Sequence, residues 1–309
     1  MTSEDWKIVG IVGPTSSNKT ELSIELADIL KGEIISADSR QIYKDLNIGT
    51  GKPRPDQLDR IKHYLISAVS PEEKISAYQY QQMADSAFQK IANKGLKCLL
   101  TGGTGLWIKA FCDGLTPTPP PNPEFRRKLL LEINKNGLEK YYSQLIRLDP
   151  GVISKIKKND KLRIIRALEI IENSSLLPSE IKWNTSKIRY KTLRIGCQRP
   201  KDVLYQIAEQ KITAWISEGW IDEVECLLGK GIDPNYPAMK ALGYSHIVQY
   251  LENRFSKATL VELIKRDTRR YIKRQLTWFR ADKRIHWLDT HRPIRQVVRE
   301  ALELINNPS

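Results

Sequence analysis

The sequence lacks the features of a membrane or secreted protein. No uninterrupted apolar run among its 309 residues approaches the length of a membrane-spanning helix. Residues 1–6 contain neither the basic segment nor the apolar core of a secretory signal. Cysteine is scarce, and Cys98, Cys112, Cys197 and Cys226 show no C-x-x-C spacing, which argues against a zinc ribbon or a disulfide framework. We therefore expect a cytoplasmic protein with reduced thiols and no membrane association.

Negative charge and histidine are also in short supply. The chain has 50 Lys and Arg against 36 Asp and Glu, which gives a net charge of +14. The four histidines, His63, His246, His286 and His291, do not have the spacing of metal ligands. An enzyme that acts only on small metabolites does not need so large a basic excess, and the excess favours a polyanionic partner such as nucleic acid. A solvated basic surface is the alternative that composition leaves open.

The first third of the chain alternates strand-like apolar runs with helical patterns, which is typical of a parallel α/β sheet. The pattern then stops at a proline-rich segment, 116–123, which can continue neither a helix nor an inner strand. The expected strands are 7–12, 32–37, 63–68 and 97–101, and the expected helices are 20–30 and 77–94.

After the prolines the sequence predicts an inserted helical domain. Residues from about 124 to 188 have helical patterns, and the strand-like run 192–197 returns the chain to the sheet. From about residue 202 onward the pattern is helical again. The predicted fold is thus a P-loop NTPase-like parallel sheet flanked by helices, with an inserted helical domain. The expected division is 1–118 for the first part of the core, 119–190 for the insertion and 191–309 for the return to the core.

One loop has the pattern of a phosphate-binding site. The segment G-P-T-S-S-N-K-T follows an apolar run, 8–12, and opens a helical pattern, which is the context that a P-loop needs. Successive backbone N–H groups and a helix N-terminus there form a cradle for phosphate oxygens. Asn replaces the usual Gly before the Lys, and it is a residue that tolerates the left-handed backbone region. The eight residues are Gly13, Pro14, Thr15, Ser16, Ser17, Asn18, Lys19 and Thr20.

Two further turns follow expected strands. Asp38 comes where a buried strand ends, at the carboxyl edge at which open α/β sheets place their active sites. A carboxylate there can act as a general base or hold a metal-bound water, or it can simply cap a following helix. The glycine-rich turn 102–105 includes Thr104 and suits close approach by a ligand, although a structural turn explains the glycines almost as well.

A basic stripe is expected near the end of the chain. On a helix, its residues would share one face, opposite Ile272, Leu276 and Phe279. Such a stripe suits a phosphate backbone, and a solvated helix face is the alternative. The stripe consists of Arg266, Arg269, Arg270, Lys273 and Arg274.

Taken together, these stretches resemble the bacterial tRNA dimethylallyltransferases, also called tRNA isopentenyltransferases. The likeness extends in the family's order from near residue 8 to about residue 285. The matching stretches are G-P-T-S-S-N-K-T at 13–20, A-D-S-R-Q-I-Y at 37–43, N-I-G-T-G-K-P at 47–53, G-G-T-G-L-W at 102–107, R-I-I-R-A-L-E at 163–169, A-M-K-A-L-G-Y at 238–244 and K-R-Q-L-T-W-F-R at 273–280.

The resemblance implies transfer of a dimethylallyl group from dimethylallyl diphosphate to N6 of the adenosine on the 3′ side of the anticodon, in tRNAs that read codons beginning with U. It implies that the loop 13–20 holds the diphosphate with Mg²⁺, with Thr20 as the metal ligand. Asp38 would accept the N6 proton, Thr104 would lie by the reacting centre, and Lys211 would belong to the catalytic group. The adenine must leave its stack to be reached.

The resemblance also implies a set of tRNA contacts. The inserted domain would clamp the anticodon stem-loop, with shape and unstacked bases carrying the recognition, and we expect a monomer. The implied tRNA-binding residues are Asp38, Ser39, Arg40, Gln41, Thr104, Arg126, Leu162, Arg163, Ile164, Ile165 and Arg166.

Three positions depart from the family pattern. Asn18 replaces a Gly, and Lys211 and Lys240 stand where Arg is frequent. Lys keeps the charge but loses the bidentate fork of Arg, so weaker diphosphate binding is the expected effect at Lys211. Two alternatives remain at this point: a P-loop kinase or NTPase that uses ATP, and a catalytically decayed tRNA-binding homologue.

Overall fold

The computed structural model describes residues 7–181 and 188–307. The chain divides into two compact units: unit 1 comprises Met1–Asp113 and Ile188–Ser309, and unit 2 is Gly114–Lys187. The chain thus leaves unit 1 once and returns to it, a few residues before each of the boundaries expected from the sequence. Each unit is described by itself.

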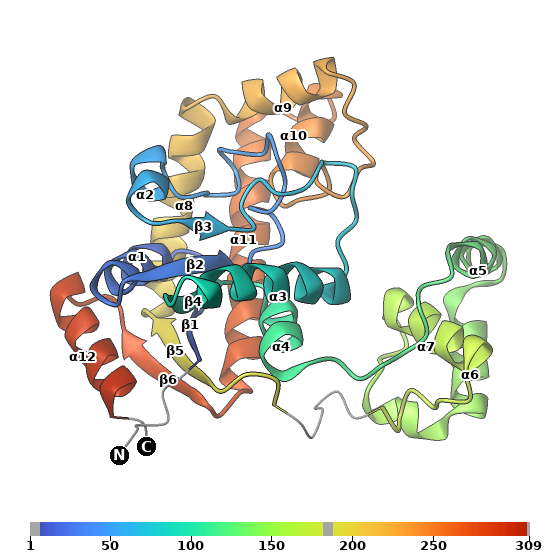
Figure 1. Ribbon diagram of the computed structural model, residues 1–309. Helices are drawn as coiled ribbons and strands as arrows, with labels where there is room; N and C mark the ends of the chain where they lie inside the picture. Colours follow the sequence, from blue (N-terminus) through green and yellow to red (C-terminus); the bar gives the residue numbers. More distant parts are fainter. Residues whose placement is uncertain (1–6, 182–187, 308–309) are drawn as a thin grey trace. The chain divides into compact units, whose positions relative to one another are not determined.

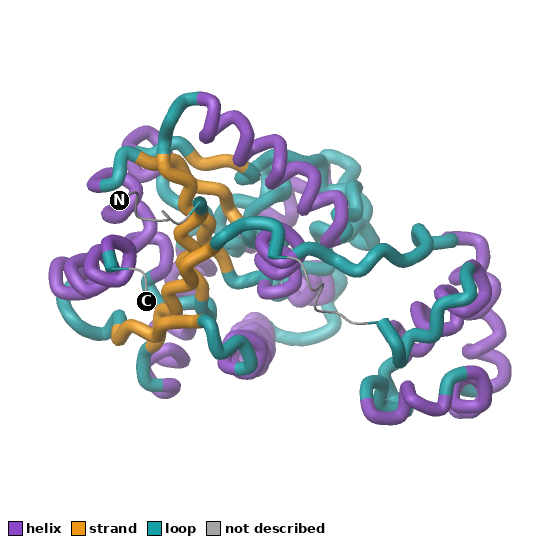
Figure 2. The backbone as a smooth tube through the Cα atoms, turned by 60° about the horizontal axis from the view of Figure 1, so that its bottom comes forward, coloured by secondary structure: helices purple, strands orange, loops and turns teal. Residues whose placement is uncertain are grey.

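Unit 1 is built on a sheet of six parallel strands (Figures 1 and 2). Helices flank the sheet, so the predicted α/β fold class is confirmed. The apolar run in β1 is buried at all five positions, as a strand covered on both faces requires. In spatial order the strands are β3 (His63–Tyr64), β2 (Gly32–Ser36), β4 (Lys97–Gly102), β1 (Ile8–Val12), β5 (Thr192–Gln198) and β6 (Ile285–Asp289).

The strand register brings several loops to one edge of the sheet. β1 lies between β4 and β5, with Val12 opposite both Gly102 and Gly196. Ser36, at the end of β2, lies opposite Thr101 of β4. Because all these strands are parallel, the segments that follow their carboxyl ends meet at the same edge. This edge therefore collects the Asp38 turn, the glycine-rich turn 102–105 and the loop 13–20, which we call the phosphate loop after its sequence motif.

Alternate side chains of the strands face two separate cores, as the period of two in a strand requires. Val9, Ile34 and Leu99 belong to the core that includes residues of α1 and α12. Ile8, Ile35 and Leu100 belong to the larger core that includes residues of α3 and α4. The helices of unit 1 are α1 (Lys19–Ile29), α2 (Pro55–Arg60), α3 (Ala77–Asn93), α4 (Gly105–Asp113), α8 (Lys201–Ser217), α9 (Trp220–Gly229), α10 (Tyr244–Leu251), α11 (Lys257–Arg280) and α12 (Ile294–Asn306).

Two strands differ from the sequence prediction. β6 was missed, because the whole segment after residue 202 was expected to be helical; β6 is a five-residue strand paired in parallel with β5. β3 was expected over 63–68 but contains only His63–Tyr64. Leu65 and Ser67 have φ values of 62° and 50°, a left-handed conformation that cannot continue a strand.

Unit 2 is helical, as predicted. Its core includes residues of all three α-helices, among them Leu129, Leu145 and Ile164. The helical pattern expected up to residue 188 ends earlier, because α7 ends at Asn173 and no helix follows it up to residue 181; residues 182–187 lie outside the described part. The elements are α5 (Pro123–Asn136), α6 (Leu138–Leu148), the short 3₁₀ helix η1 (Pro150–Ser154) and α7 (Lys161–Asn173).

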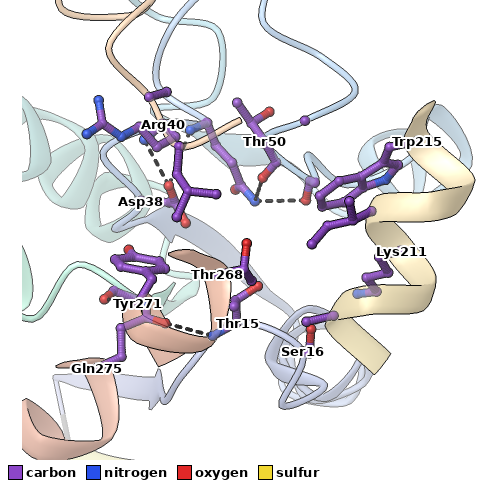
Figure 3. A pocket seen from close by; sticks show the side chains of 18 of the residues that line it. Thr15, Ser16, Asp38, Arg40, Thr50, Lys211, Trp215, Thr268, Tyr271 and Gln275 are labelled. Atoms are coloured by element: carbon purple, nitrogen blue, oxygen red, sulfur yellow. Dashed lines mark hydrogen bonds between the residues drawn. The ribbon is translucent and has the colours of Figure 1, made fainter. Parts of the chain in front are cut away.

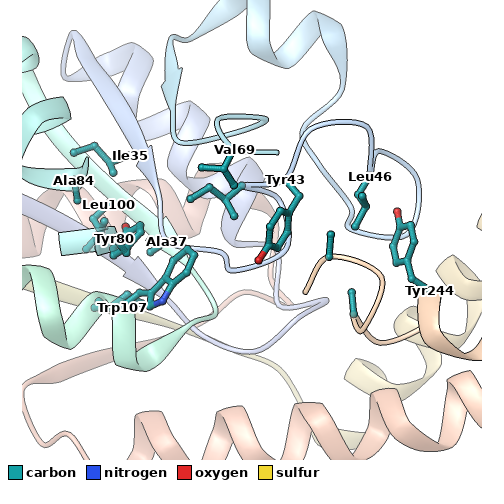
Figure 4. Close-up of a cluster of buried hydrophobic side chains, with 14 of the residues drawn as sticks. Ile35, Ala37, Tyr43, Leu46, Val69, Tyr80, Ala84, Leu100, Trp107 and Tyr244 are labelled. Atoms are coloured by element: carbon teal, nitrogen blue, oxygen red, sulfur yellow. The ribbon is translucent and has the colours of Figure 1, made fainter. Parts of the chain in front are cut away.

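Tyr80 connects the packing of α3 to the edge of the sheet. Its side chain is fully buried, stacks on Trp107 with ring centroids 4.2 Å apart, and donates a hydrogen bond to Ser36 O at 3.1 Å (Figure 4). The bonded carbonyl lies two residues before Asp38, so the ring supports the backbone that leads into the site.

We predict that Tyr80→Ala lowers the free energy of unfolding by about 3–5 kcal/mol, since it opens a large cavity in the core. Tyr80→Phe should lower it by about 1 kcal/mol through loss of the hydrogen bond to Ser36 O. Chemical denaturation of the purified variants measures both values. Tyr78→Ala, at a side chain 59% exposed on the same helix, is the matched control, and an equal loss in this control would contradict the prediction.

Candidate active site

The phosphate loop has a left-handed backbone at two non-glycine residues. Ser16 and Asn18 have φ values of 66° and 65°. Asn18 directly precedes α1 and adopts the conformation that Asn tolerates better than other non-glycine residues. A Cβ atom at Gly13 would lie 2.6 Å from Cys197 O, so the loop packs directly against the end of β5. The substitution of Asn for Gly at residue 18 is therefore compatible with the loop's shape.

The polar groups of this loop are arranged for an anion. Ser16 Oγ is buried and has no hydrogen-bond partner within the described residues. Lys19 Nζ donates to Pro14 O at 2.5 Å, and burial lowers the pKa of Lys19 to about 8. A bound anion would both satisfy the serine hydroxyl and favour the charged lysine. Ser16, Lys19 and Thr20 all line one cavity at this edge of the sheet.

A second ammonium group adds positive charge to the cavity beside Lys19. Lys211 lies on α8 and lines the cavity, with its side chain open to the solvent there. Desolvation by the surrounding protein and, to a smaller extent, the positive charge of the nearby Arg199 lower the pKa of Lys211 from its usual value. The charge of Lys211 also contributes to the lowered pKa of Lys19. Two lysines with depressed pKa values in one cavity fit a multiply charged anion such as a diphosphate.

Two residues that were not expected from the sequence donate hydrogen bonds to backbone carbonyl groups of the phosphate loop. Thr290 Oγ1, just after β6, donates to Ser17 O at 2.8 Å. Arg199 Nη1, just after β5, donates to Ser16 O at 3.4 Å, and its Nε donates to Thr290 O at 2.9 Å. The expectation of helix after residue 202 hid the strand that brings Thr290 to this place.

Gln275 of α11 connects two loops of the sheet edge (Figure 3). The backbone N–H of Thr15 donates to Gln275 Oε1 at 2.9 Å, and Gln275 Nε2 donates to Gly103 O at 3.0 Å. The amide is buried, and a Cβ atom at Gly103 would lie 2.3 Å from Gln275 Nε2. Gln275 was not among the residues expected from the sequence, although a Gln between the apolar Ile272 and Leu276 was a detectable signal.

The carboxylate of Asp38 orders a turn rather than a helix. Asp38 Oδ1 accepts hydrogen bonds from Arg40 N at 2.8 Å and from Gln41 N at 3.3 Å. Residues 39–42 form turns, so the alternative of a helix cap is wrong. The side chain is partly exposed and lines the cavity. The turn thus fixes one carboxylate oxygen and aims the group at the cavity.

Thr104 and its neighbouring glycines join the Asp38 turn to the rest of the site. Thr104 Oγ1 accepts from Ser39 N at 3.0 Å, and Thr104 N donates to Ala37 O at 3.1 Å. A Cβ atom at Gly102 would lie 2.2 Å from Ala37 O, and one at Gly105 would lie 2.0 Å from Trp278 Nε1. Close packing of protein segments therefore accounts for these glycines. Thr104 is not one of the lining residues of the cavity, but it is hydrogen-bonded to the turn that carries Asp38.

The cavity itself has a volume of about 600 Å³. Lys19, Thr20 and Lys211 all line it, and we call the part that they line its cationic end. In Figure 3, Asp38 lies across the cavity from Lys211 and Trp215 of α8. The loop segment with Gly49, Thr50 and Gly51, the helices α8 and α11, and residues 240–242 complete the walls. Within the described residues no three His, Cys, Asp or Glu side chains gather as a metal cluster. The cavity thus presents phosphate-binding groups and a carboxylate to one bound molecule or pair of molecules.

The implied tRNA-binding residues of unit 2 have different environments. Arg126 and Arg166 both pair with Glu169, whose side chain is fully buried, and Arg166 Nη2 also donates to Thr118 Oγ1 at 2.9 Å. Arg166 therefore attaches the proline-rich segment to α7, and Arg126 attaches α5 to α7. Leu162 and Arg163 are exposed, with the Leu162 residue 79% and the Arg163 side chain 65% accessible.

Ile164 and Ile165 are buried in the core of unit 2, 0% and 4% exposed. Contact of these two residues with RNA stays a prediction: their side chains pack in the interior of unit 2, whereas Leu162 and Arg163 are exposed.

The basic stripe of α11 is only partly available for a ligand. Arg269 pairs with Glu209 of α8 at 2.7 Å, and Arg266 and Arg270 both pair with Asp267. Lys273 and Arg274 are exposed, and Arg274 lines the cavity. The face opposite the stripe is buried, as predicted.

No helix of the described residues is long and apolar enough to cross a membrane.

The six-stranded parallel sheet, with the loop 13–20 between β1 and α1, places the chain among proteins of P-loop NTPase-like fold. Residues 41–282 match the model of the IPP transferase family. The chain therefore belongs to the IPP transferase family, and it is a transferase.

Individual relatives agree with this assignment. The chain is 39% identical over 285 residues to a protein from Halothermothrix orenii named tRNA dimethylallyltransferase, which covers 91% of this chain and 87% of that protein. A protein of the same name from Syntrophobacter fumaroxidans is 37% identical, with 99% and 91% covered. The structure is similar to a tRNA isopentenylpyrophosphate transferase from Staphylococcus epidermidis, with a TM-score of 0.72, 31% identity, and 97% and 98% of the chains covered.

We predict that Gln275→Leu lowers the free energy of unfolding by about 1–3 kcal/mol, because it leaves the buried Gly103 carbonyl without its partner. It should also weaken the binding of inorganic diphosphate, since Thr15 N–H loses its fixed position. Denaturant titration and calorimetry measure the two effects. In Gln249→Leu, the hydrogen bond lost is one to Ser245 O within the same helix, so unchanged diphosphate binding is expected there; equal effects in both variants would refute the role of Gln275.

The lowered pKa of Lys19 predicts how diphosphate binding depends on pH. The charged lysine binds the anion, so the affinity should fall as pH rises through about 8. In the free protein the sign is opposite: Lys19 loses its proton near pH 8 when folded but retains it to its usual 10.5 when unfolded, so its contribution to stability rises between these values. Calorimetry with inorganic diphosphate tests this, with Lys19→Met as the reference for the ligand's own ionisation. A parallel pH dependence in both proteins would contradict the assignment.

Proposed function

We propose that the protein transfers a dimethylallyl group from dimethylallyl diphosphate to N6 of the adenosine on the 3′ side of the anticodon, in tRNAs that read codons beginning with U. One observation carries the proposal: the phosphate loop and the carboxylate of Asp38 line the same cavity of about 600 Å³. The names of the relatives, tRNA dimethylallyltransferase, support the choice of both substrates.

The reaction makes two demands on this cavity. The bond from N6 to the allylic carbon forms while the bond from that carbon to the diphosphate oxygen breaks, so the leaving diphosphate takes the electron pair. N6 then carries one proton too many. The site must therefore stabilise a multiply charged leaving group at one end and accept a proton at the other.

Residues of the cationic end meet the first demand. The backbone N–H groups of the loop, the Ser16 hydroxyl and the ammonium groups of Lys19 and Lys211 would hold the diphosphate. Their charges are already in place before the bond breaks, so the developing negative charge is stabilised without rearrangement. The apolar side chains of α8 that line the cavity, Ala208, Ile212 and Trp215, offer a wall for the prenyl group beside Lys211.

The residues present fit Mg²⁺ as a cofactor. Mg²⁺ prefers oxygen ligands and keeps several waters, so it needs few protein groups when a substrate phosphate also binds it. The Thr20 hydroxyl at the start of α1 would hold the ion next to the diphosphate. When bound, the ion supplies charge neutralisation for the leaving group.

Asp38 meets the second demand. One of its oxygens is held by the N–H groups of Arg40 and Gln41, which fixes the direction of the carboxylate. The proton of N6 would pass to this group as the new bond forms. Thr104 acts on the same turn through Ser39 N, so we assign to it the positioning of the base.

The tRNA would reach the site with its acceptor adenosine unstacked, because N6 of a base stacked between its neighbours cannot approach a carboxylate in the wall of the cavity. Arg40 and Gln41 border the cavity, and the exposed Leu162 and Arg163 of unit 2 remain candidates for RNA contact. The net charge of +14 supports a polyanionic substrate. We propose that a single chain carries out the reaction.

We predict that Asp38→Asn lowers the rate of transfer at least about a hundredfold, the usual contribution of a general base, while tRNA binding stays close to wild type. The assay combines the protein, Mg²⁺, dimethylallyl diphosphate and an unmodified anticodon stem-loop, with the modified nucleoside measured by mass after digestion. Asp45→Asn, at an exposed carboxylate outside the cavity walls, is the matched control. RNA binding without any product in the wild-type protein would instead support a decayed enzyme.

A further inference from the structure

Tyr271 is an aromatic residue of the cavity that the steps above do not use. It lies on the face of α11 that also carries Thr268 and Gln275, three residues before it and four after it, and all three line the cavity (Figure 3). Gln275 is bonded to Thr15 N and Gly103 O, which fixes this part of α11 against the sheet edge. The position of the Tyr271 ring relative to the site is therefore set by the same contact that joins the two loops.

The ring lies on the Asp38 side of the cavity. Figure 3 shows Tyr271 below Asp38, across the cavity from Lys211 and Trp215 of α8. Burial and the charge of Asp38 raise the pKa of the Tyr271 hydroxyl, so the ring is neutral near pH 7. The guanidinium of Arg274 lies 5.8 Å from the ring centroid and lines the cavity as well. A flat, uncharged aromatic surface thus stands beside the carboxylate, with the Arg274 guanidinium over one of its faces.

The two ends of the cavity suit different parts of the substrates. The α8 side joins apolar side chains to Lys211, which matches a prenyl group attached to a diphosphate. The opposite side joins an aromatic ring to a carboxylate and an arginine. Nucleobases that have left their stack are held by stacking on aromatic side chains, and a nearby arginine suits the phosphate next to such a base.

We propose that the ring of Tyr271 is the platform on which the acceptor adenine stacks, with N6 directed at Asp38. This inference rests on the proposed function, and it names a residue that determines how the base is held. Stacking requires the ring and not its hydroxyl. The role of Tyr271 is therefore distinguished from hydrogen bonding by comparing Phe with an aliphatic side chain at this position.

The experiment uses Tyr271→Leu and Tyr271→Phe in the full chain. With an anticodon stem-loop as substrate, Tyr271→Leu is expected to raise the KM for the RNA about five- to hundredfold, the range of one lost base–aromatic stack, with the KM for dimethylallyl diphosphate unchanged. Tyr271→Phe should restore the KM for the RNA. Tyr78→Leu, at an exposed tyrosine of α3, controls for loss of an aromatic side chain in general, and inorganic diphosphate binding controls for folding.

A second readout does not depend on transfer. A stem-loop with 2-aminopurine at the acceptor position fluoresces strongly when this base is unstacked and weakly when it is stacked. The bound complex should be dim with Tyr or Phe at position 271 and brighter with Leu. Equal fluorescence in all three proteins, or a change in the KM for dimethylallyl diphosphate alone, would overturn the inference. If the wild-type protein binds RNA but transfers nothing, the proposed function fails, and the fluorescence comparison still decides whether Tyr271 stacks the base.

Discussion

The amide of Gln275 is the contact on which the arrangement of the site depends. It accepts a hydrogen bond from Thr15 N in the phosphate loop and donates one to Gly103 O in the glycine-rich turn, and it belongs to a helix 260 residues away from the loop. A buried amide bonded at both ends tolerates few alternative geometries. The sheet brings the loops to one edge, and Gln275 fixes their separation and the orientation of α11. The Gln275 amide thereby joins the part of α11 that carries Tyr271 to both loops of the cavity.

The electrostatics of the cavity explain why a P-loop can serve a diphosphate leaving group. The pKa of Lys19 is lowered to about 8 and that of Lys211 is also lowered, so the free protein holds two ammonium groups in an unfavourable environment. A bound diphosphate would offset this cost and would give the buried Ser16 hydroxyl a hydrogen-bond partner. A P-loop NTPase would also need a carboxylate after a later strand. The strand β4 (Lys97–Gly102) ends in Thr101 and Gly102 and is followed by Gly103, so no carboxylate stands there. The family match and the site chemistry both favour group transfer to RNA over nucleotide hydrolysis.

The sequence predicted those features that depend on local pattern. The buried strands were predicted because apolar runs are contiguous in the chain, and the strand–loop–helix order around residues 13–20 was predicted from a contiguous motif. β6 was missed because a five-residue strand at the edge of the sheet, in which His286 is exposed, lacks a clear apolar run. Gln275 and Thr290 were missed because their role depends on contacts with loops more than two hundred residues away.

The burial of Ile164 and Ile165 was not considered when they were expected, with their neighbours, to contact RNA, although the helical period places their side chains in the core.

In the proposed reaction the cavity couples loss of diphosphate to modification of RNA. The most direct test incubates the protein with an anticodon stem-loop and either dimethylallyl diphosphate or ATP, and measures inorganic diphosphate, orthophosphate and the mass of the RNA. We predict that inorganic diphosphate appears in equal amount to prenylated adenosine, and that ATP is left unchanged. Release of orthophosphate from ATP, or modification of the RNA without release of diphosphate, would contradict the account.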